Sequence, residues 1–241
     1  MDELQKGHWW YRGRRFIVKT LFNKYVGEQK TTDSFLDVGC GTGEGSFIVD
    51  NPSQLIGIDE SKEALSLAKG KGYSALYEGR ADTLPFLNAS FSGILAMDVL
   101  EHVTNDGAVL EECFRVAAPG ALLFLTVPAF LWLWSRHDEI VGHKRRYTKD
   151  ELVQKVENAG FEVLFASYKV MFLFPIAVLF CLVEKTSAKH ISKFFPIPKV
   201  LNAFFFSIVA FESMLFRFGL RLPFGTSLVL VARKNVSPQA P

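Results

Sequence analysis

The sequence predicts an α/β protein with a doubly wound sheet. An apolar run from Phe35 to Val38 breaks into three glycines at alternate positions, Gly39, Gly41 and Gly43. Glu44 follows as the first residue of an expected helix. Further along, strand-like apolar runs alternate with segments whose apolar residues recur at helical spacing. A strand, a glycine turn and a helix in this order place a ligand-binding loop at the carboxyl edge of a sheet.

The remaining elements follow in chain order. Ser61 is expected to cap a helix that Gly70 ends, and Thr148 and Glu151 have the spacing of a capping box at the start of another. A further helix carries Cys113 on its apolar face. The expected later strands are residues 54–59, 73–77, a run from Phe91 that leads into residues 98–102, then 121–127, 161–169 and 226–233.

Length and composition limit the classes of protein. The chain has 241 residues, enough for one α/β domain with a full core and an elaboration. Its net charge of +2 does not favour nucleic acid as a partner. Three widely spaced cysteines, Cys40, Cys113 and Cys181, predict neither a disulfide framework nor a metal site. The N-terminus is charged and aromatic rather than continuously apolar, so we expect no signal peptide and a cytoplasmic location.

Two nucleotide ligands compete for the glycine loop. A dinucleotide fingerprint needs glycine or alanine three positions after Gly41, and Glu44 stands there, badly placed beside a pyrophosphate. S-adenosylmethionine (SAM) has no phosphate, and its amino-acid end suits an acid such as Asp37 beside exposed backbone groups. The run from Asp37 to Gly43 resembles the first motif of the class I SAM-dependent methyltransferases of the type-11 kind.

This resemblance covers roughly residues 8–169 and 225–234. It implies a Rossmann-like, seven-stranded doubly wound sheet with an antiparallel last strand, SAM as the cofactor, and Asp59 as the residue that binds the ribose. Residues 98–102 resemble the Asp-Val-Leu-Glu-His run that the family places beside the methyl group. Arg80 stands where the family often has an acid, so either Asp82 or the backbone of Ala81 is expected to contact the adenine. The implied cofactor-binding residues are Asp37, Gly39, Cys40, Gly41, Gly43, Asp59, Glu60, Ala81, Asp82 and Asp98.

Two segments are expected on the acceptor side of the site. An aromatic and basic N-terminal segment, with Tyr11 and Arg12, is interpreted as a lid rather than as a nucleic-acid site. The second segment is the loop of residues 128–147, because loops at the carboxyl ends of strands carry specificity. Its acceptor-side candidates are Trp134, Arg145, Arg146 and Tyr147.

Three histidines, His102, His137 and His143, are candidates for a general base. A structural role is favoured for His102. His137, His143 and Asp138 could hold a metal, but no third tight ligand spacing appears, so an ion-pair network is favoured. The sequence therefore predicts no metal.

An unusual insertion, residues 170–224, precedes the last strand. It holds 12 of the 23 phenylalanines, with six Lys and Arg against two Glu. Its apolar stretches, 170–183 and 200–211, are shorter than the ~18 residues of a membrane-spanning helix. Asn202, Ser213 and Arg217 share one narrow face of the second, and Lys185, Lys189, Lys193 and Lys199 lie near and between the stretches. Three destinations stay open: the inner surface of a membrane, the catalytic domain, or a homodimer.

We thus expect a SAM-dependent methyltransferase acting on a small or lipid-linked acceptor. The alternatives are a non-catalytic SAM-fold scaffold and another SAM-using transferase. The expected organisation is a lid helix in residues 1–30, a SAM-binding domain in 31–169, a helical hydrophobic insertion in 170–224, and the last strand and tail in 225–241. The acceptor and the atom that is methylated do not follow from the sequence.

Overall fold

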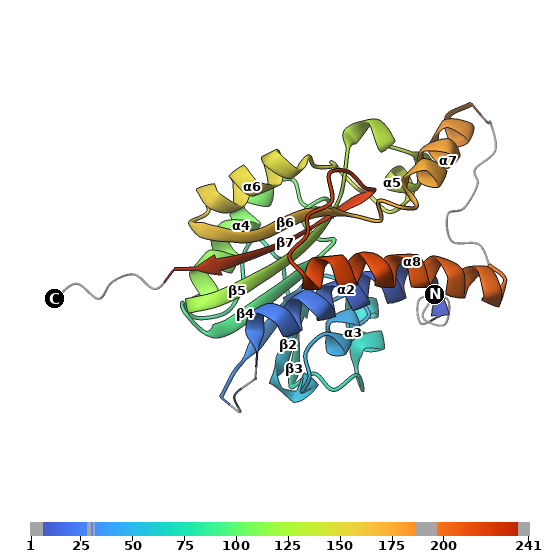
Figure 1. Ribbon diagram of the computed structural model, residues 1–241. Coiled ribbons are helices and arrows are strands. Elements are labelled where there is room, and N and C mark those ends of the chain that lie inside the picture. Colours follow the sequence, from blue (N-terminus) through green and yellow to red (C-terminus); the bar gives the residue numbers. More distant parts are fainter. Residues whose placement is uncertain (1–6, 28–29, 31, 187–196, 236–241) are drawn as a thin grey trace.

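A seven-stranded sheet with a reversed strand near one edge organises the protein, as the computed structural model of residues 7–27, 30, 32–186 and 197–235 shows (Figure 1). The strand order is β3-β2-β1-β4-β5-β7-β6, and β7 alone runs antiparallel to its neighbours. The predicted seven-stranded, doubly wound sheet is therefore confirmed. The strands are β1 (Phe35–Val38), β2 (Leu55–Asp59), β3 (Ala75–Glu78), β4 (Phe91–Met97), β5 (Ala117–Pro128), β6 (Phe161–Lys169) and β7 (Ser227–Lys234).

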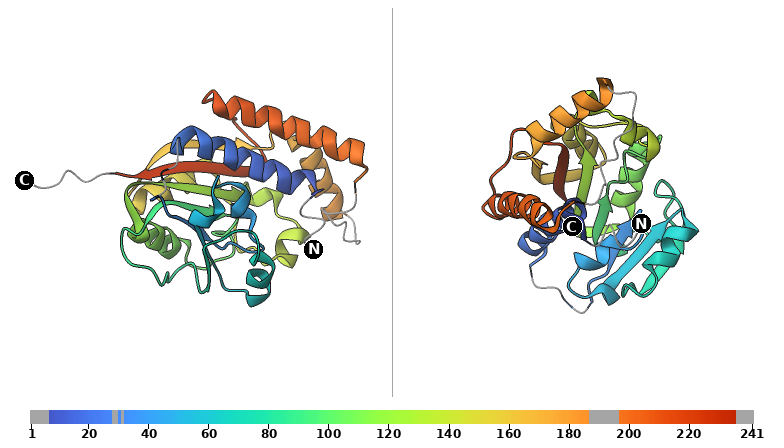
Figure 2. Two further views of the ribbon diagram at one scale, coloured as in Figure 1. Left: turned by 90° about the horizontal axis from the view of Figure 1, so that it is seen from below. Right: turned by 90° about the vertical axis from the view of Figure 1, so that its right-hand side faces the viewer.

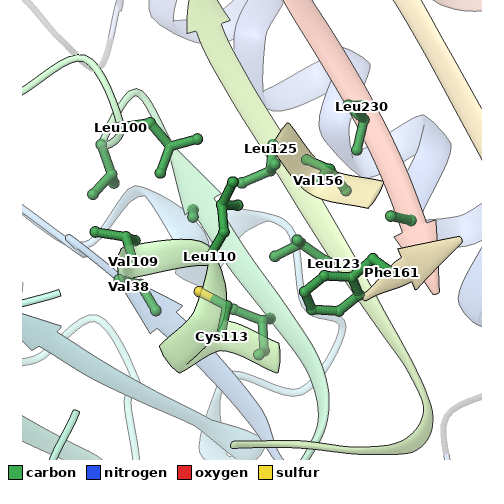
Figure 3. Packing of buried hydrophobic residues seen from close by; sticks show 14 of the residues in the cluster. Val38, Leu100, Val109, Leu110, Cys113, Leu123, Leu125, Val156, Phe161 and Leu230 are labelled. Carbon is green, nitrogen blue, oxygen red and sulfur yellow. The ribbon is translucent and has the colours of Figure 1, made fainter. Parts of the chain in front are cut away.

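Helices cover both faces of the sheet (Figure 2). On one face α4 and α6 pack through Cys113, Val156 and their apolar neighbours (Figure 3). On the other, α2 packs through Ile17, Leu21 and Phe22, and α8 lies outside it as a further layer. The helices are α2 (Trp9–Val26), α3 (Lys62–Ala68), α4 (Asp106–Val116), α5 (Arg136–Ile140), α6 (Lys149–Asn158), α7 (Phe174–Thr186) and α8 (Lys199–Arg217).

Two local expectations were wrong. The helix expected after Glu44 is only a 3-10 turn, Glu44–Phe47, because Gly45 and the β-branched Ile48 and Val49 favour helix weakly and Pro52 follows soon after. Strand β5 also begins four residues before the expected start of its strand, where the pairing with β4 shifts register to absorb the extra residues.

The described part of the insertion forms helices α7 and α8, and two polar residues of α8 face inward. The amide of Asn202 accepts a hydrogen bond from the Trp9 backbone at 2.7 Å, and the Ser213 hydroxyl donates to Thr20 at 2.7 Å. Gly13 lets the two helices approach closely, since a Cβ there would lie 2.8 Å from Val209. Two residues of the narrow polar face predicted on this helix, Asn202 and Ser213, therefore contact α2, whereas the third, Arg217, is exposed. The helix also buries Val209 and Phe216, and other large apolar residues are turned outward.

Glu212 fixes α8 to the segment that follows β6. Its carboxylate is fully buried and accepts hydrogen bonds from the backbone N–H groups of Val170 at 2.6 Å and Phe172 at 2.9 Å. Val170 has a φ of +62°, a conformation that a β-branched residue rarely adopts. This acidic residue on a mostly apolar helix holds that turn in place.

Replacing Glu212 by alanine should lower the free energy of unfolding by about 2–5 kcal/mol, because two buried donors lose their acceptor. Urea denaturation measures the loss. Glu212→Gln should be milder, and Glu157→Ala on the exposed side of α6 should change stability by no more than about 0.5 kcal/mol. Equal stability of the Glu212→Ala protein and the wild type would contradict this role.

The outer faces of α7 and α8 expose large apolar side chains. On α8, Val200 is 84% exposed and Phe204 57%; on α7, Leu179 is 63% exposed. Helix α8 meets the length and composition criterion for a membrane-crossing helix, although core helices of soluble proteins meet it too. Four lysines were noted in this part of the sequence. The described residues leave out Lys189, Lys193 and the side chain of Lys185, and the fourth, Lys199, is exposed.

Candidate functional site

A cavity of about 530 Å³ lies at the carboxyl edge of β1 and β4. The order of the sheet reverses between these strands, which is where α/β sheets bind ligands. The glycine loop forms one wall and α2 another. The turn after β4, the loop of residues 128–147 and α7 line it as well. The expected lid segment and the insertion thus both reach the site.

The glycine loop presents main chain to this cavity. Gly39 and Gly41 have positive φ, and a Cβ at Gly39 would lie 2.6 Å from a methyl group of Val99. Beside Gly41 the space is open, so a ligand can touch the backbone there. Asp59 supports this turn, accepting hydrogen bonds from the N–H of Gly41 at 2.8 Å and of Ser61 at 2.9 Å. These features fit the adenosyl and amino-acid parts of SAM.

Asp37 lies under the glycine loop with 1% of its surface exposed. Its carboxylate accepts a hydrogen bond from the Tyr73 hydroxyl at 2.6 Å. Burial raises the pKa of Asp37 to about 7, and the Tyr73 hydrogen bond and the charge of Arg14 only partly oppose that rise. An ammonium group bound next to Asp37 would favour its ionised form.

This pKa predicts a pH-dependent affinity for SAM. Below about pH 7 Asp37 holds a proton in the free protein, so binding an ammonium group must displace it and affinity falls as the pH falls. Titration calorimetry with SAM between pH 5.5 and 7.5 should show weaker binding at the acid end. The Asp37→Asn side chain cannot ionise, so the affinity of that variant for SAM should depend less on pH. An unchanged pH dependence would assign it to another group.

Arg14 of α2 lies near two carboxylates at the carboxyl edge of the sheet. It donates a hydrogen bond to Asp98, at the end of β4, and lies 3.9 Å from Glu44. Burial alone would raise the pKa of Asp98, but Arg14 and the buried Lys169 outweigh it and hold that pKa well below its usual range. The sequence analysis did not single out Arg14, although it lies in the segment that was interpreted as a lid.

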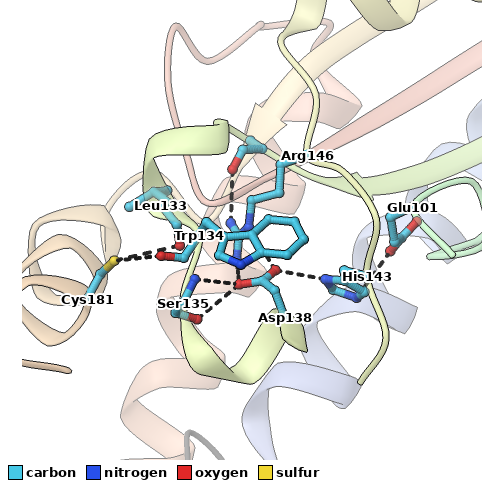
Figure 4. A network of polar contacts seen from close by, with 9 residues as sticks. Glu101, Leu133, Trp134, Ser135, Asp138, His143, Arg146 and Cys181 are labelled. Carbon is cyan, nitrogen blue, oxygen red and sulfur yellow. Dashed lines mark hydrogen bonds and ion pairs between the residues drawn. The ribbon is translucent and has the colours of Figure 1, made fainter. Parts of the chain in front are cut away.

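Asp138 organises the loop of residues 128–147 (Figure 4). It is fully buried, accepts two hydrogen bonds from Arg146 at 2.8 and 3.0 Å, and contacts His143 Nδ1 at 2.8 Å. The backbone and hydroxyl of Ser135 donate to it as well. Although burial opposes them, these partners hold the pKa of Asp138 well below its usual range. The ion-pair network expected in this loop is present, and Asp138 is its centre.

The three histidine candidates all line the cavity. The rings of His102 and His143 are 4.8 Å apart, and those of His137 and His143 are 6.5 Å apart. Burial, followed by the neighbouring His143, lowers the pKa of His102, which favours its neutral form. The fully buried Glu101 lies beside them, and the sequence analysis did not select it even though it falls inside the run 98–102.

The other expected site residues divide into two groups. Asp37, Gly39, Cys40, Gly41, Asp98, Tyr11 and Arg146 line the cavity, whereas Gly43, Asp59, Glu60, Ala81, Asp82, Arg12, Trp134, Arg145 and Tyr147 are outside its lining. Asp82 pairs with Arg80 at 2.6 Å. Arg145 and Tyr147 both bind Asp106, so their described contacts stabilise the loop.

Comparison with known proteins adds to this geometry. Residues 36–125 match the methyltransferase domain family. Over this stretch the chain resembles SAM-dependent methyltransferases. Family and fold imply SAM as the cofactor of this methyltransferase domain.

Several relatives of the domain have known names. A probable SAM-dependent methyltransferase of Mycolicibacterium smegmatis is 26% identical over 164 residues, which are 66% of this chain and 62% of the relative. The ubiquinone biosynthesis O-methyltransferase of Bradyrhizobium is 34% identical over 101 residues, 38% of either chain. The match thus spans less than two thirds of these relatives. A structure from Thermotoga maritima, described as a possible histamine N-methyltransferase, shares the fold with a TM-score of 0.57 and 19% identity over 94% of this chain and 93% of that one.

Proposed function

We propose that this protein transfers the methyl group of SAM to a small or lipid-linked acceptor at a membrane surface. The observation that carries the proposal is the position of the cavity. It lies between the glycine loop of the methyltransferase domain and helix α7, whose outer face is apolar and exposed. An apolar acceptor could pass from that face into the site.

The site residues have separable roles in this reaction. SAM supplies a methyl group on a positively charged sulfur, a good leaving group, so the protein mainly aligns the reactants and excludes water. Asp37 and the glycine loop would hold the amino-acid end, with Arg14 offering a guanidinium to its carboxylate. Asp59 would hold the ribose. His102, His137 and His143 line the cavity and are the candidates for the base that takes a proton from the acceptor.

Membrane attachment is supported by the direction in which α8 faces. Asn202 and Ser213 contact α2, so the outward face contains Val200, Phe204 and Phe211. A helix whose outward face carries large apolar side chains gains by covering that face with lipid or protein. The excess of positive charge in residues 170–224 favours an anionic lipid surface as the cover.

Two successive measurements test the proposed function. Calorimetry with SAM establishes cofactor binding, and incubation with labelled SAM and lipid extracts then detects methyl transfer. Labelled product in the lipid fraction is the expected result. SAM binding without transfer to any lipid or water-soluble extract would instead favour a non-catalytic scaffold, and failure to bind SAM would overturn the proposal.

A further inference from the structure

Glu101 is a buried carboxylate that lacks a described hydrogen-bond partner. It is 0% exposed, and neither of its oxygens has a hydrogen-bond partner among the described residues. Burial and the neighbouring charge of Asp98 raise its pKa well above the usual range. An acid in such a place costs stability unless something compensates it. Glu101 also lines the cavity, so whatever compensates it can enter from there.

Two histidines complete a ligand set around this carboxylate. Glu101, His102 and His143 each offer a donor atom, and these atoms all lie within 4.8 Å of one another. Nε2 of His143 is 3.9 Å from the Glu101 carboxylate. Ligands at about 2.0–2.2 Å from one ion are roughly 3–4 Å apart, so small side-chain rotations would close the set.

Neighbouring residues orient His143 for metal binding. Asp138 is ionised and lies 2.8 Å from Nδ1, so it holds the proton on that nitrogen and leaves the Nε2 lone pair directed toward Glu101 (Figure 4). A carboxylate that orients the far nitrogen of a ligating histidine is a recurrent feature of metal sites. The backbone N–H of Lys144 donates to the Glu101 carbonyl at 2.7 Å, which fixes the loop against the turn after β4.

We propose that Glu101, His102 and His143 bind a divalent first-row transition-metal ion on the acceptor side of the SAM cavity. Two imidazoles and one carboxylate suit such ions, and three protein ligands leave coordination positions open. Those positions face the cavity, which all three residues line. The sequence analysis missed this set because it sought a third ligand near His137, whereas Glu101 lies 42 residues before His143.

The ion's role rests on the proposed function, but its binding does not. An acceptor oxygen held by the cation loses its proton more readily. The O–H bond would break with the proton passing to His137, which lines the cavity and is not among the three ligands, and the oxygen lone pair would form the O–CH₃ bond. The C–S bond of SAM breaks, and its electron pair returns to sulfur as a neutral thioether. Oxygen rather than a neutral amine is therefore the acceptor atom that this site favours.

Metal binding is tested without SAM or acceptor. Protein that carries no histidine tag is stripped with a chelator and titrated with Mn²⁺ and with Zn²⁺ by calorimetry, and bound Mn²⁺ is followed by electron paramagnetic resonance. We expect one ion per chain. Glu101→Gln and His143→Gln should lose this binding, and Asp138→Asn, which only positions His143, should weaken it ~10–100-fold. His137→Gln removes an imidazole from the same cavity and should bind like the wild type.

The competing explanation is a proton shared between Glu101 and His143. It predicts no saturable binding of either ion, and that result would overturn the proposal. Metal binding that survives Glu101→Gln would overturn it as well. Urea denaturation checks that each variant is folded. Glu101→Gln should be as stable as the metal-free wild type or more so, but added Mn²⁺ should stabilise only the wild type. Metal binding by a protein that transfers no methyl group would leave this inference standing while the proposed function failed.

Discussion

A variant with Val200, Phe204 and Phe211 replaced by serine should no longer float with anionic liposomes, whereas the wild-type protein should float at low salt. All three residues are on the exposed side of α8. Full burial of such side chains contributes about 1.5–3 kcal/mol each, and partial insertion less, so we expect a loss of about 100-fold or more in membrane partitioning. High ionic strength should also weaken binding of the wild type through screening of its lysines.

The choice of phenylalanines matters in this experiment. Phe205 packs against Trp9 and Phe206 against Phe16, with ring centroids 5.4 and 5.8 Å apart. Serine at either position would loosen α8 from α2 and mix a folding defect with a binding defect. A matched control replaces Leu67 and Leu87, which are exposed on the methyltransferase domain, and should float normally.

A homodimer is the alternative use of the same face. It predicts a dimer in sedimentation that the triple serine variant disrupts, and no response to lipid. Wild-type protein that stays at the bottom of the gradient at low salt would exclude surface attachment.

The sheet could be predicted from the sequence because its signals are local. Each strand is a short apolar run, and the three glycines, Gly39, Gly41 and Gly43, have the positive φ that their spacing suggested. Helix α8 shows the limit of such signals. Its narrow polar face was visible as periodicity, but whether Asn202 and Ser213 faced water or protein depended on Trp9 and Thr20, almost 200 residues away in the sequence.

The site was predictable in part for the same reason. Residues of one motif, such as Asp37 and Gly41, reach the cavity together because one turn carries them. Arg14 was missed because its partner Asp98 lies 84 residues away, and Glu101 because its buried oxygens lack a described hydrogen-bond partner. Asp138 was considered only as a metal ligand, whereas its hydrogen bonds with Arg146 make it the centre of the loop. Arg145 and Tyr147 were expected to contact the acceptor, but Asp106 binds both. A charged loop looks the same in sequence whether its charges meet a ligand or one another.

Replacing Asp59 by alanine should lower the affinity for SAM by roughly 1.5–3 kcal/mol, or about 10–150-fold in Kd. Its carboxylate accepts hydrogen bonds from Gly41 and Ser61, and its remaining lone pairs are available for two ribose hydroxyls. Calorimetry measures the change. Asp59→Asn should be milder, because one acceptor oxygen remains, and an unchanged affinity in Asp59→Ala would remove Asp59 from the site.

Loss of affinity alone does not separate ribose binding from support of the glycine loop, because Asp59 contacts Gly41 directly. A cycle that combines Asp59→Ala with a 2′-deoxy analogue of the demethylated cofactor product separates them. If Asp59 binds the ribose, removing the 2′-hydroxyl should lower the affinity of the wild type for the ligand and lower that of the variant much less. If the two losses add in full, Asp59 acts only through the loop, and the ribose is bound by other groups.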